Sequence, residues 1–239
     1  MANKIQIDPP NFKSGFIAIV GAPNVGKSTL MNRILGEKLS ITSKKPQTTR
    51  NRILGVLHRP DSQLIFIDTP GVHPARRPIN IRFVETAVAA LGDVDLVLLI
   101  IDVSTPDPIS ENQLVAQLNK TQRSTVLALN KIDRVDKSRL LGMLDHWSGS
   151  YPFKTMVPIS AKTGEQVDTL IATLQSHLPA GPPLFPDDQV TDLPERFFVS
   201  EMIREKVFRL TGAEIPYATA VTIESFTEDP DRPLITIHA

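Results

Sequence analysis

The chain has 239 residues, 41% hydrophobic and only 5% aromatic, which suits one large domain with an aliphatic core or one domain plus a smaller unit. Basic and acidic side chains balance at 26 each, which excludes a general attraction to nucleic acid or membrane and limits any such site to a local patch. There is no cysteine, which excludes disulfides and thiolate metal sites.

Neither a targeting segment nor a membrane span is predicted. Residues 1–15 lack the apolar stretch of a signal peptide. The longest apolar run covers residues 96–101, ends in aspartate on both sides, and is far too short to cross a bilayer. We therefore expect a cytoplasmic protein.

The first elements alternate between strand and helix. Apolar residues 16–20 end at a glycine and predict a buried strand, and residues 28–35 predict a helix that ends at Gly36. Residues 37–49 are polar and aperiodic, which indicates a loop. Two further strands are predicted over 52–57 and 63–68, joined by a turn at 59–61.

The alternation continues through the middle of the chain. Apolar spacing predicts helices around 83–91, 138–147 and 167–178, with strands over 95–102, 125–130 and 155–159. Strands that alternate with helices favour right-handed crossovers and a parallel sheet covered on both faces. We therefore predict an α/β fold with a mostly parallel six-stranded sheet.

A change of composition follows residue 178. Five prolines between residues 179 and 194 predict a stiff linker, and Pro194 starts a helix. Strands are predicted over 217–226 and 234–238. We predict a nucleotide-binding domain over 12–179, a linker over 180–193 and a second, incomplete domain over 194–239.

Residues 21–28, here called the phosphate loop, read Gly-Ala-Pro-Asn-Val-Gly-Lys-Ser and fit G-x-x-x-x-G-K-[ST] between a strand and a helix. Glycine lets the backbone N–H groups approach phosphate oxygens at the helix N-terminus. Lys27 is expected to reach the β- and γ-phosphates, and Ser28 Oγ to bind Mg²⁺. The alternative is a glycine-rich turn without a ligand.

Residues 68–71, Asp-Thr-Pro-Gly, end the strand over 63–68. Asp68 there can hold Mg²⁺ through water, and the Gly71 N–H can meet a γ-phosphate. Taken alone, this segment is equally typical of an ordinary turn.

Two further segments predict that the base is guanine. Asp133, in the segment Asn-Lys-Ile-Asp (130–133), can accept both guanine N1–H and N2–H₂, a donor pair that adenine lacks. Asn130 can tie this segment to the phosphate loop, and the Lys131 stem can cover the nucleotide. Ser-Ala-Lys (160–162) follows the next strand, where the Ala161 N–H can meet guanine O6. Each segment alone is also typical of a solvated turn.

These four segments in this order are the signature of TRAFAC-class GTPases. Together with Lys-Pro-Gln-Thr-Thr-Arg (45–50), Asp-Thr-Pro-Gly-Val-His (68–73) and residues 194–208, they resemble the Era family of bacterial GTPases over nearly the whole chain. The resemblance implies slow GTP hydrolysis with Mg²⁺, binding to the 3′ end of 16S ribosomal RNA, and assistance in small-subunit assembly. It further implies a cytoplasmic location with some peripheral inner-membrane association.

By the same resemblance, Thr49 is the Mg²⁺ ligand of switch I, ordered only when a γ-phosphate is present. Val72 stands where Ras-like GTPases place a water-orienting glutamine, which predicts slow hydrolysis. Asn24 stands where related enzymes hold a K⁺ that stabilises charge on the phosphates, or it only shapes the loop. The expected catalytic residues are Lys27, Thr49, Gly71 and Asn24, and the expected metal ligands are Ser28, Thr49, Asp68 through water, and Asn24 for K⁺.

The nucleotide-binding residues expected from all segments are Gly21, Ala22, Pro23, Asn24, Val25, Gly26, Lys27, Ser28, Thr29, Asp68, Thr69, Pro70, Gly71, Val72, Asn130, Lys131, Ile132, Asp133, Ser160, Ala161 and Lys162.

The C-terminal segment resembles the start of a KH domain but lacks the G-x-x-G loop that clamps nucleic acid, because Gly212 is its only glycine after residue 193. We therefore expect a truncated domain. Arg204, Lys206 and Arg209 form either a remnant basic patch or a solvated helix face.

Two other functions stay open at this stage. One is a nucleotide-gated binding module with negligible turnover, which single-turnover hydrolysis would distinguish. The other is a P-loop ATPase or kinase, which Asp133 disfavours because a buried carboxylate facing adenine would find no donor pair.

Overall fold

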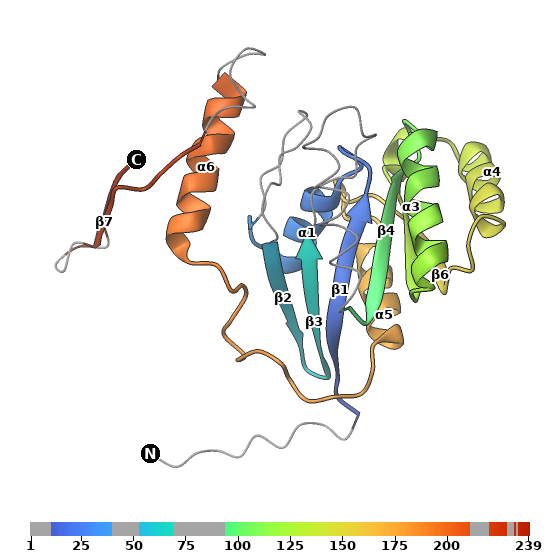
Figure 1. Cartoon of the computed structure of the whole chain (residues 1–239), viewed down its shortest axis with the longest axis horizontal. Coiled ribbons are helices and arrows are strands. Elements are labelled where there is room, and N and C mark those ends of the chain that lie inside the picture. The colour runs from blue at the N-terminus through green and yellow to red at the C-terminus, as the bar shows by residue number, and fades with distance from the viewer. Residues whose placement is uncertain (1–10, 40–52, 69–93, 211–219, 229–231, 233) are drawn as a thin grey trace.

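The computed structural model describes residues 11–39, 53–68, 94–210, 220–228, 232 and 234–239 (Figure 1). A six-stranded sheet has the strand order β2-β3-β1-β4-β5-β6. Its strands are β1 (Lys13–Gly21), β2 (Ile53–Arg59), β3 (Ser62–Asp68), β4 (Leu96–Asp102), β5 (Thr125–Asn130) and β6 (Thr155–Ile159). The helices around it are α1 (Lys27–Leu35), α3 (Pro108–Thr121), α4 (Lys137–Ser148) and α5 (Val167–His177).

Five of the six strands are parallel, and only β2 runs antiparallel, to β3. A two-residue connection, Pro60 and Asp61, joins β2 to β3, which is the short hairpin link that an antiparallel pair permits. The parallel strands need crossovers, and helices supply them on both faces. The predicted α/β fold with a mostly parallel six-stranded sheet is confirmed.

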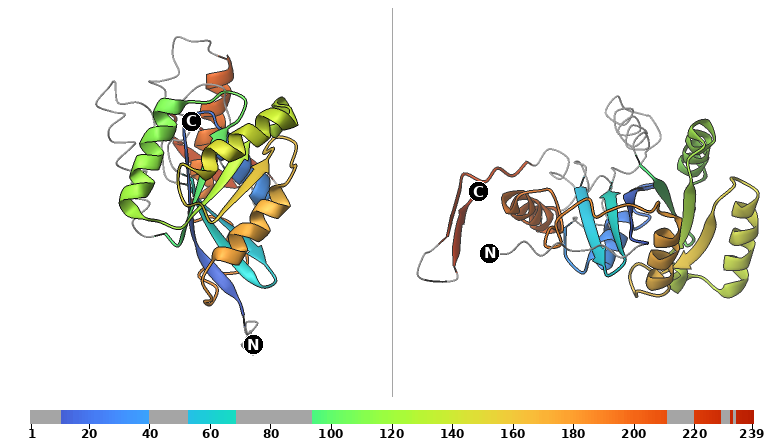
Figure 2. Two further views of the ribbon diagram at one scale, coloured as in Figure 1. Left: turned by 90° about the vertical axis from the view of Figure 1, so that its right-hand side faces the viewer. Right: turned by 90° about the horizontal axis from the view of Figure 1, so that it is seen from below.

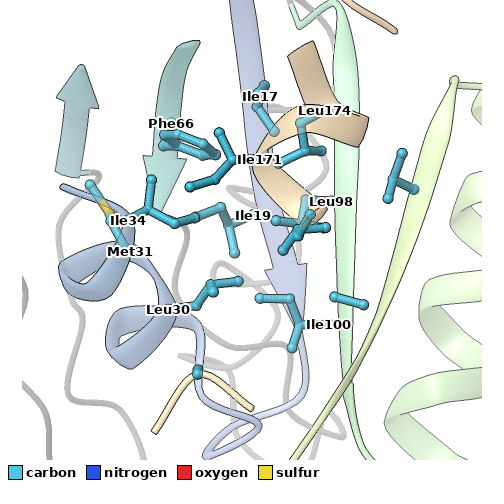
Figure 3. Packing of buried hydrophobic residues seen from close by; sticks show 14 of the residues in the cluster. Ile17, Ile19, Leu30, Met31, Ile34, Phe66, Leu98, Ile100, Ile171 and Leu174 are labelled. Atoms are coloured by element: carbon cyan, nitrogen blue, oxygen red, sulfur yellow. The ribbon is translucent and has the colours of Figure 1, made fainter. Parts of the chain in front are cut away.

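The two faces of the sheet bury two separate aliphatic cores. Because side chains alternate along a strand, Ile17 and Ile19 of β1 face one core whereas Ala18 and Val20 face the other. The first core is closed by α1 and α5, as Figure 3 shows. The second core is closed by α3 and α4. Strand β4 is buried along its whole length, so its sequence is continuously apolar.

Helix α3 was not predicted from the sequence. Its buried face contains Ser110 and Glu111 beside Leu114 and Leu118, so the apolar spacing that signals a helix is interrupted. Polar contacts stabilise its start instead: the Asp107 side chain accepts from the Ser110 N–H at 3.2 Å, and Glu111 Oε1 accepts from the Asp107 N–H at 3.1 Å. Burial raises the pKa of Glu111, more than the hydrogen bond from Asp107 lowers it.

The linker lies along the sheet and is joined to it by several hydrogen bonds. The Val56 N–H of β2 donates to the Val190 carbonyl at 2.8 Å, and Thr191 Oγ1 donates to the Leu54 carbonyl at 2.7 Å. The buried Gln63 amide accepts from the N–H groups of Leu184 and Phe185 at 2.7 and 2.9 Å. The bonds of Val56 and Leu54 thus occupy the outer edge of β2 with a segment of the same chain, and those of Gln63 fix the linker to β3.

Beyond the linker, α6 (Glu195–Leu210) packs its first turn against the α1 side of the sheet through Phe197 and Phe198. Glu205, only 1% exposed, pairs with Lys38 at 2.5 Å. A short hairpin of β7 (Ser225–Glu228) and β8 (Ile235–His238) follows, and both lie on the α6 side of the molecule, away from α3 and α4 (Figure 2).

Some expectations for this C-terminal region are corrected. Within the described part of the strand predicted over 217–226, residues 220–224 have no regular structure and the strand begins only at Ser225 of β7. Arg204 is neither a free basic patch nor a solvated face, because it is 3% exposed and both Glu201 oxygens accept from it at 2.7 and 2.5 Å. The division into domains stays a prediction, and the helix predicted around 83–91 lies outside the described residues. No helix in the described part of the chain is both long and apolar enough for a bilayer.

Candidate functional site

The predicted site segments meet at one edge of the sheet, where the carboxyl ends of the parallel strands lie together. The phosphate loop connects β1 to α1, and Asn24 and Gly26 adopt left-handed backbone angles with φ of 61° and 107°. A Cβ at Gly26 would lie 2.3 Å from Asn130 Nδ2, so only glycine permits this close approach. The loop thus curves around the N-terminus of α1, as phosphate binding requires.

Lys27, the first residue of α1, folds its side chain back over the loop. Its ammonium donates to the carbonyls of Gly21 at 3.0 Å and Ala22 at 2.8 Å. Burial lowers the pKa of Lys27 to about 8, and the nearby Asp68 carboxylate opposes that shift. A buried ammonium held by neutral carbonyls is a strong partner for an anion.

Ser28 and Asp68 lie side by side, although they are forty residues apart. Ser28 Oγ donates to Asp68 Oδ2 at 3.1 Å, and Asp68 is fully buried at the end of β3. A hydroxyl and a carboxylate are hard oxygen ligands of the kind that Mg²⁺ prefers. The chemistry of this pair therefore fits the predicted magnesium site.

Asn130 joins the two halves of the site with one buried amide. Its Nδ2 donates to the Val25 carbonyl of the phosphate loop at 2.7 Å, and its Oδ1 accepts from the Ala161 N–H at 2.9 Å. The tie to the phosphate loop agrees with the sequence-based expectation. The Ala161 N–H, expected to face guanine O6, has this protein acceptor instead, so its contact with a base stays a prediction.

Asp133 lies at the end of the site where base recognition is predicted from the sequence. It belongs to a short 3₁₀ turn, η1 (Ile132–Arg134), and its Oδ1 accepts from Ser160 Oγ at 2.7 Å. The same Ser160 Oγ accepts from the Thr163 N–H at 3.2 Å, which fixes the hydroxyl. The carboxylate is thereby oriented at the entrance of the site while its side chain is still 19% exposed.

Two residues of this region were missed from the sequence. Asp102, at the end of β4, accepts from the Lys131 ammonium, which also donates to the Asn24 carbonyl at 2.8 Å. Arg33 of α1 donates to the carbonyls of Ala161, at 3.4 Å, and of Lys162. Asp102 does carry a usable signal, since it is a charged residue directly after a buried apolar run, whereas Arg33 lies on a helix face and carries none.

The remaining predicted residues divide into two groups. Ile132 is partly buried against the second core, and Thr29 lies in the first turn of α1. Thr49, Thr69, Pro70, Gly71 and Val72 lie outside the described residues.

Comparison with known proteins identifies the family of this arrangement. Residues 16–131 match the profile described as "50S ribosome-binding GTPase". GTPase Era of Geobacter metallireducens is 50% identical over 228 residues, covering 95% of this chain and 76% of that protein. GTPase Era of Syntrophus aciditrophicus is 47% identical, with 95% and 74% covered. A crystal structure of Era with MgGDPNP and nucleotides 1506–1542 of 16S ribosomal RNA has a TM-score of 0.87 at 38% identity, covering 95% of this chain and 77% of that one.

Replacement of Asn130 by Ala is expected to lower the free energy of unfolding by about 2 to 4 kcal/mol, because it leaves the Val25 carbonyl and the Ala161 N–H buried without their partner. Urea unfolding measures the change. Asn119→Ala, the same substitution at an exposed position of α3, is the matched control and should change stability by less than about 0.5 kcal/mol. Equal effects of both substitutions would contradict a structural tie through Asn130.

Proposed function

This chain belongs to the Era family of GTPases, and we propose that it is a guanine-nucleotide switch that binds the 3′ end of 16S ribosomal RNA and assists assembly of the small ribosomal subunit. One observation supports this function above the others: Asn130 binds the phosphate loop and the Ser160–Lys162 segment together, with Asp133 oriented beside them. Such a site combines phosphate binding with reading of the base.

The phosphates are held by the chain's backbone and by Lys27. N–H groups of the phosphate loop and of the first turn of α1 point at the phosphate oxygens. The Lys27 ammonium, which donates to the neutral carbonyls of Gly21 and Ala22 among the described residues, turns to the β- and γ-phosphates. The phosphate charge favours its protonated form, against the burial that lowers its pKa to about 8.

Ser28 Oγ would hold a magnesium ion directly and Asp68 would hold it through water, in line with the contact between these two side chains. When bound, the ion neutralises charge on the β- and γ-phosphates. Thr49 of switch I would be a further Mg²⁺ ligand, and the Gly71 N–H would meet the γ-phosphate. Val72 cannot orient water by a hydrogen bond, so intrinsic hydrolysis is slow, and Asn24 supports a K⁺ site beside the phosphates.

The guanine base is read by Asp133. Its carboxylate accepts the N1–H and N2–H₂ donors together, and the bond from Ser160 holds it in the required plane. An adenine base offers no such pair and leaves the carboxylate unsatisfied, so ATP is rejected.

Asp133→Asn is expected to weaken GDP binding by about a hundredfold or more and to create binding of xanthosine diphosphate. Xanthine presents a carbonyl where guanine presents N2–H₂, so an amide replaces the carboxylate as its partner. Titration with fluorescent analogues of both nucleotides measures the exchange. Asp168→Asn, at an exposed position of α5, should leave both affinities unchanged. An Asp133→Asn variant that still prefers GDP would contradict guanine reading and return the ATPase alternative.

Single-turnover hydrolysis of bound GTP is expected to be faster in K⁺ than in Na⁺ at equal ionic strength, because K⁺ at Asn24 adds positive charge beside the developing phosphate charge. Asn24→Ala should remove the difference. Equal rates in the two salts would restrict Asn24 to shaping the loop, in agreement with its φ of 61°. GTP that stays intact in both salts would favour the alternative of a nucleotide-gated binding module.

The RNA partner rests on family membership and on the solved Era complex with 16S ribosomal RNA nucleotides. From the same family membership we propose a location in the cytoplasm with peripheral inner-membrane association. Residues 194–239 are the proposed KH-like unit, after the linker over 180–193.

An oligonucleotide of the 16S 3′ end is expected to bind this chain more tightly when the protein contains a non-hydrolysable GTP analogue than when it contains GDP. Fluorescence anisotropy at about 0.15 M salt, with a scrambled oligonucleotide as control, separates this preference from general phosphate attraction. No binding to the specific sequence, with guanine binding intact, would contradict the RNA role for this chain and favour the binding-module alternative whose RNA contacts are lost.

A further inference from the structure

Asp102 is a buried acid beside the nucleotide site that the mechanism above does not use. It is the last residue of β4, 6% exposed, and it pairs in register with Asn130 of the neighbouring strand. The strand before it is fully buried and apolar, so a carboxylate at this point must be compensated by hydrogen bonds.

Both oxygens of Asp102 are compensated. Oδ1 accepts from the Ser104 N–H at 2.8 Å, from Ser104 Oγ at 2.6 Å and from the Thr105 N–H at 3.2 Å. Oδ2 accepts from the Lys131 ammonium. Burial alone would raise the pKa of Asp102, but the bonds from Lys131 and Ser104 outweigh it and hold the pKa below its ordinary value. The group is therefore an anion at neutral pH.

Lys131 transfers the influence of this anion to the phosphate loop. Its ammonium contacts Asp102 and, at 2.8 Å, the Asn24 carbonyl. The preceding residue, Asn130, holds the next carbonyl of the loop, that of Val25. Two consecutive residues at the end of β5, Asn130 and Lys131, thus bind two consecutive carbonyls of the phosphate loop, and Asp102 fixes the charged residue of the two.

We propose that Asp102 is a positioning residue for nucleotide retention, which holds the Lys131 ammonium on the Asn24 carbonyl and thereby slows the release of bound guanine nucleotide. The inference rests on the proposed guanine-nucleotide site. With its ammonium fixed at both contacts, the Lys131 stem is held across the edge of the site, and the phosphate loop stays joined to the base-recognition segment. Without the Asp102 carboxylate, the Lys131 ammonium keeps the neutral Asn24 carbonyl among its described acceptors, and water competes with that carbonyl for the ammonium.

Asp102 is expected to affect the release of nucleotide but not the hydrolysis of bound GTP. Asp102 contacts neither Lys27 nor Ser28 among the described interactions of these residues, which involve Gly21, Ala22 and Asp68. Asp102→Asn should therefore accelerate dissociation of fluorescent GDP by about tenfold to a hundredfold, the range expected for loss of a charge-assisted hydrogen bond. The single-turnover rate of GTP that is already bound should stay within about twofold of the wild type.

The experiment is a double-mutant cycle on the whole chain, with stopped-flow release of fluorescent GDP in excess unlabelled GDP. Lys131→Met keeps the apolar stem and removes the ammonium, and it should also accelerate release. In the Lys131→Met background, Asp102→Asn should add nothing, because its effect passes through the missing ammonium. Asp145→Asn, the same change at an exposed position of α4, is the control and should match the wild type.

Three outcomes would overturn the proposal. Release from Asp102→Asn at the wild-type rate would exclude a role in retention. An equal acceleration in the presence and absence of the Lys131 ammonium would mean that Asp102 acts through the Ser104 turn instead. If Asp102→Asn does not fold, Lys131→Met decides instead. GDP release from Lys131→Met at the wild-type rate would count against the proposal. Faster release from Lys131→Met, together with a wild-type rate in Ser104→Ala, would support it. A wild-type chain that binds no GDP would instead refute the proposed function.

Discussion

The site depends on one buried side-chain amide. Asn130 donates to the phosphate loop and accepts from the loop after β6, and its short, neutral amide does both at once because it carries the donor and the acceptor on separate atoms. Gly26 has no Cβ, and this lets the phosphate loop approach the Asn130 amide, since any side chain at position 26 would collide with that amide. The backbone of the phosphate loop at Gly26 therefore leaves the space that the Asn130 side chain fills.

Charge is concentrated at this same edge, while the sheet behind it is aliphatic. Lys27, Asp68, Asp102 and Lys131 are buried or partly buried, and each has a hydrogen-bond partner. Lys27 binds carbonyls of the phosphate loop itself, whereas the other three bind residues of another segment. Buried charges are stabilising only when such partners are held in place. The rigid apolar strands that end here supply that fixed geometry, which is why the polar groups follow the strands directly.

Local sequence pattern was sufficient for most of the fold and for the principal site contacts. The phosphate loop and the Asn130 segment are recognisable because each needs particular residue types at fixed spacing. The position of Asp102 directly after a buried apolar run is a usable signal, but its partner could not be predicted, because Lys131 lies beside it only once β4 and β5 pair. The burial of Arg204 and the polar face of α3 likewise depend on packing that the sequence does not display.

The hydrogen bonds between the linker and β2 have a mechanical consequence for the C-terminal segment. The last of them is made by Thr191, and α6 begins at Glu195, so only three residues separate a fixed strand edge from a helix of 16 residues. Such a helix is about 24 Å long. If the contacts of Phe197, Phe198 and Glu205 were released, a pivot within those three residues would make α6 a lever: a rotation of about 10° there would displace its far end by about 4 Å.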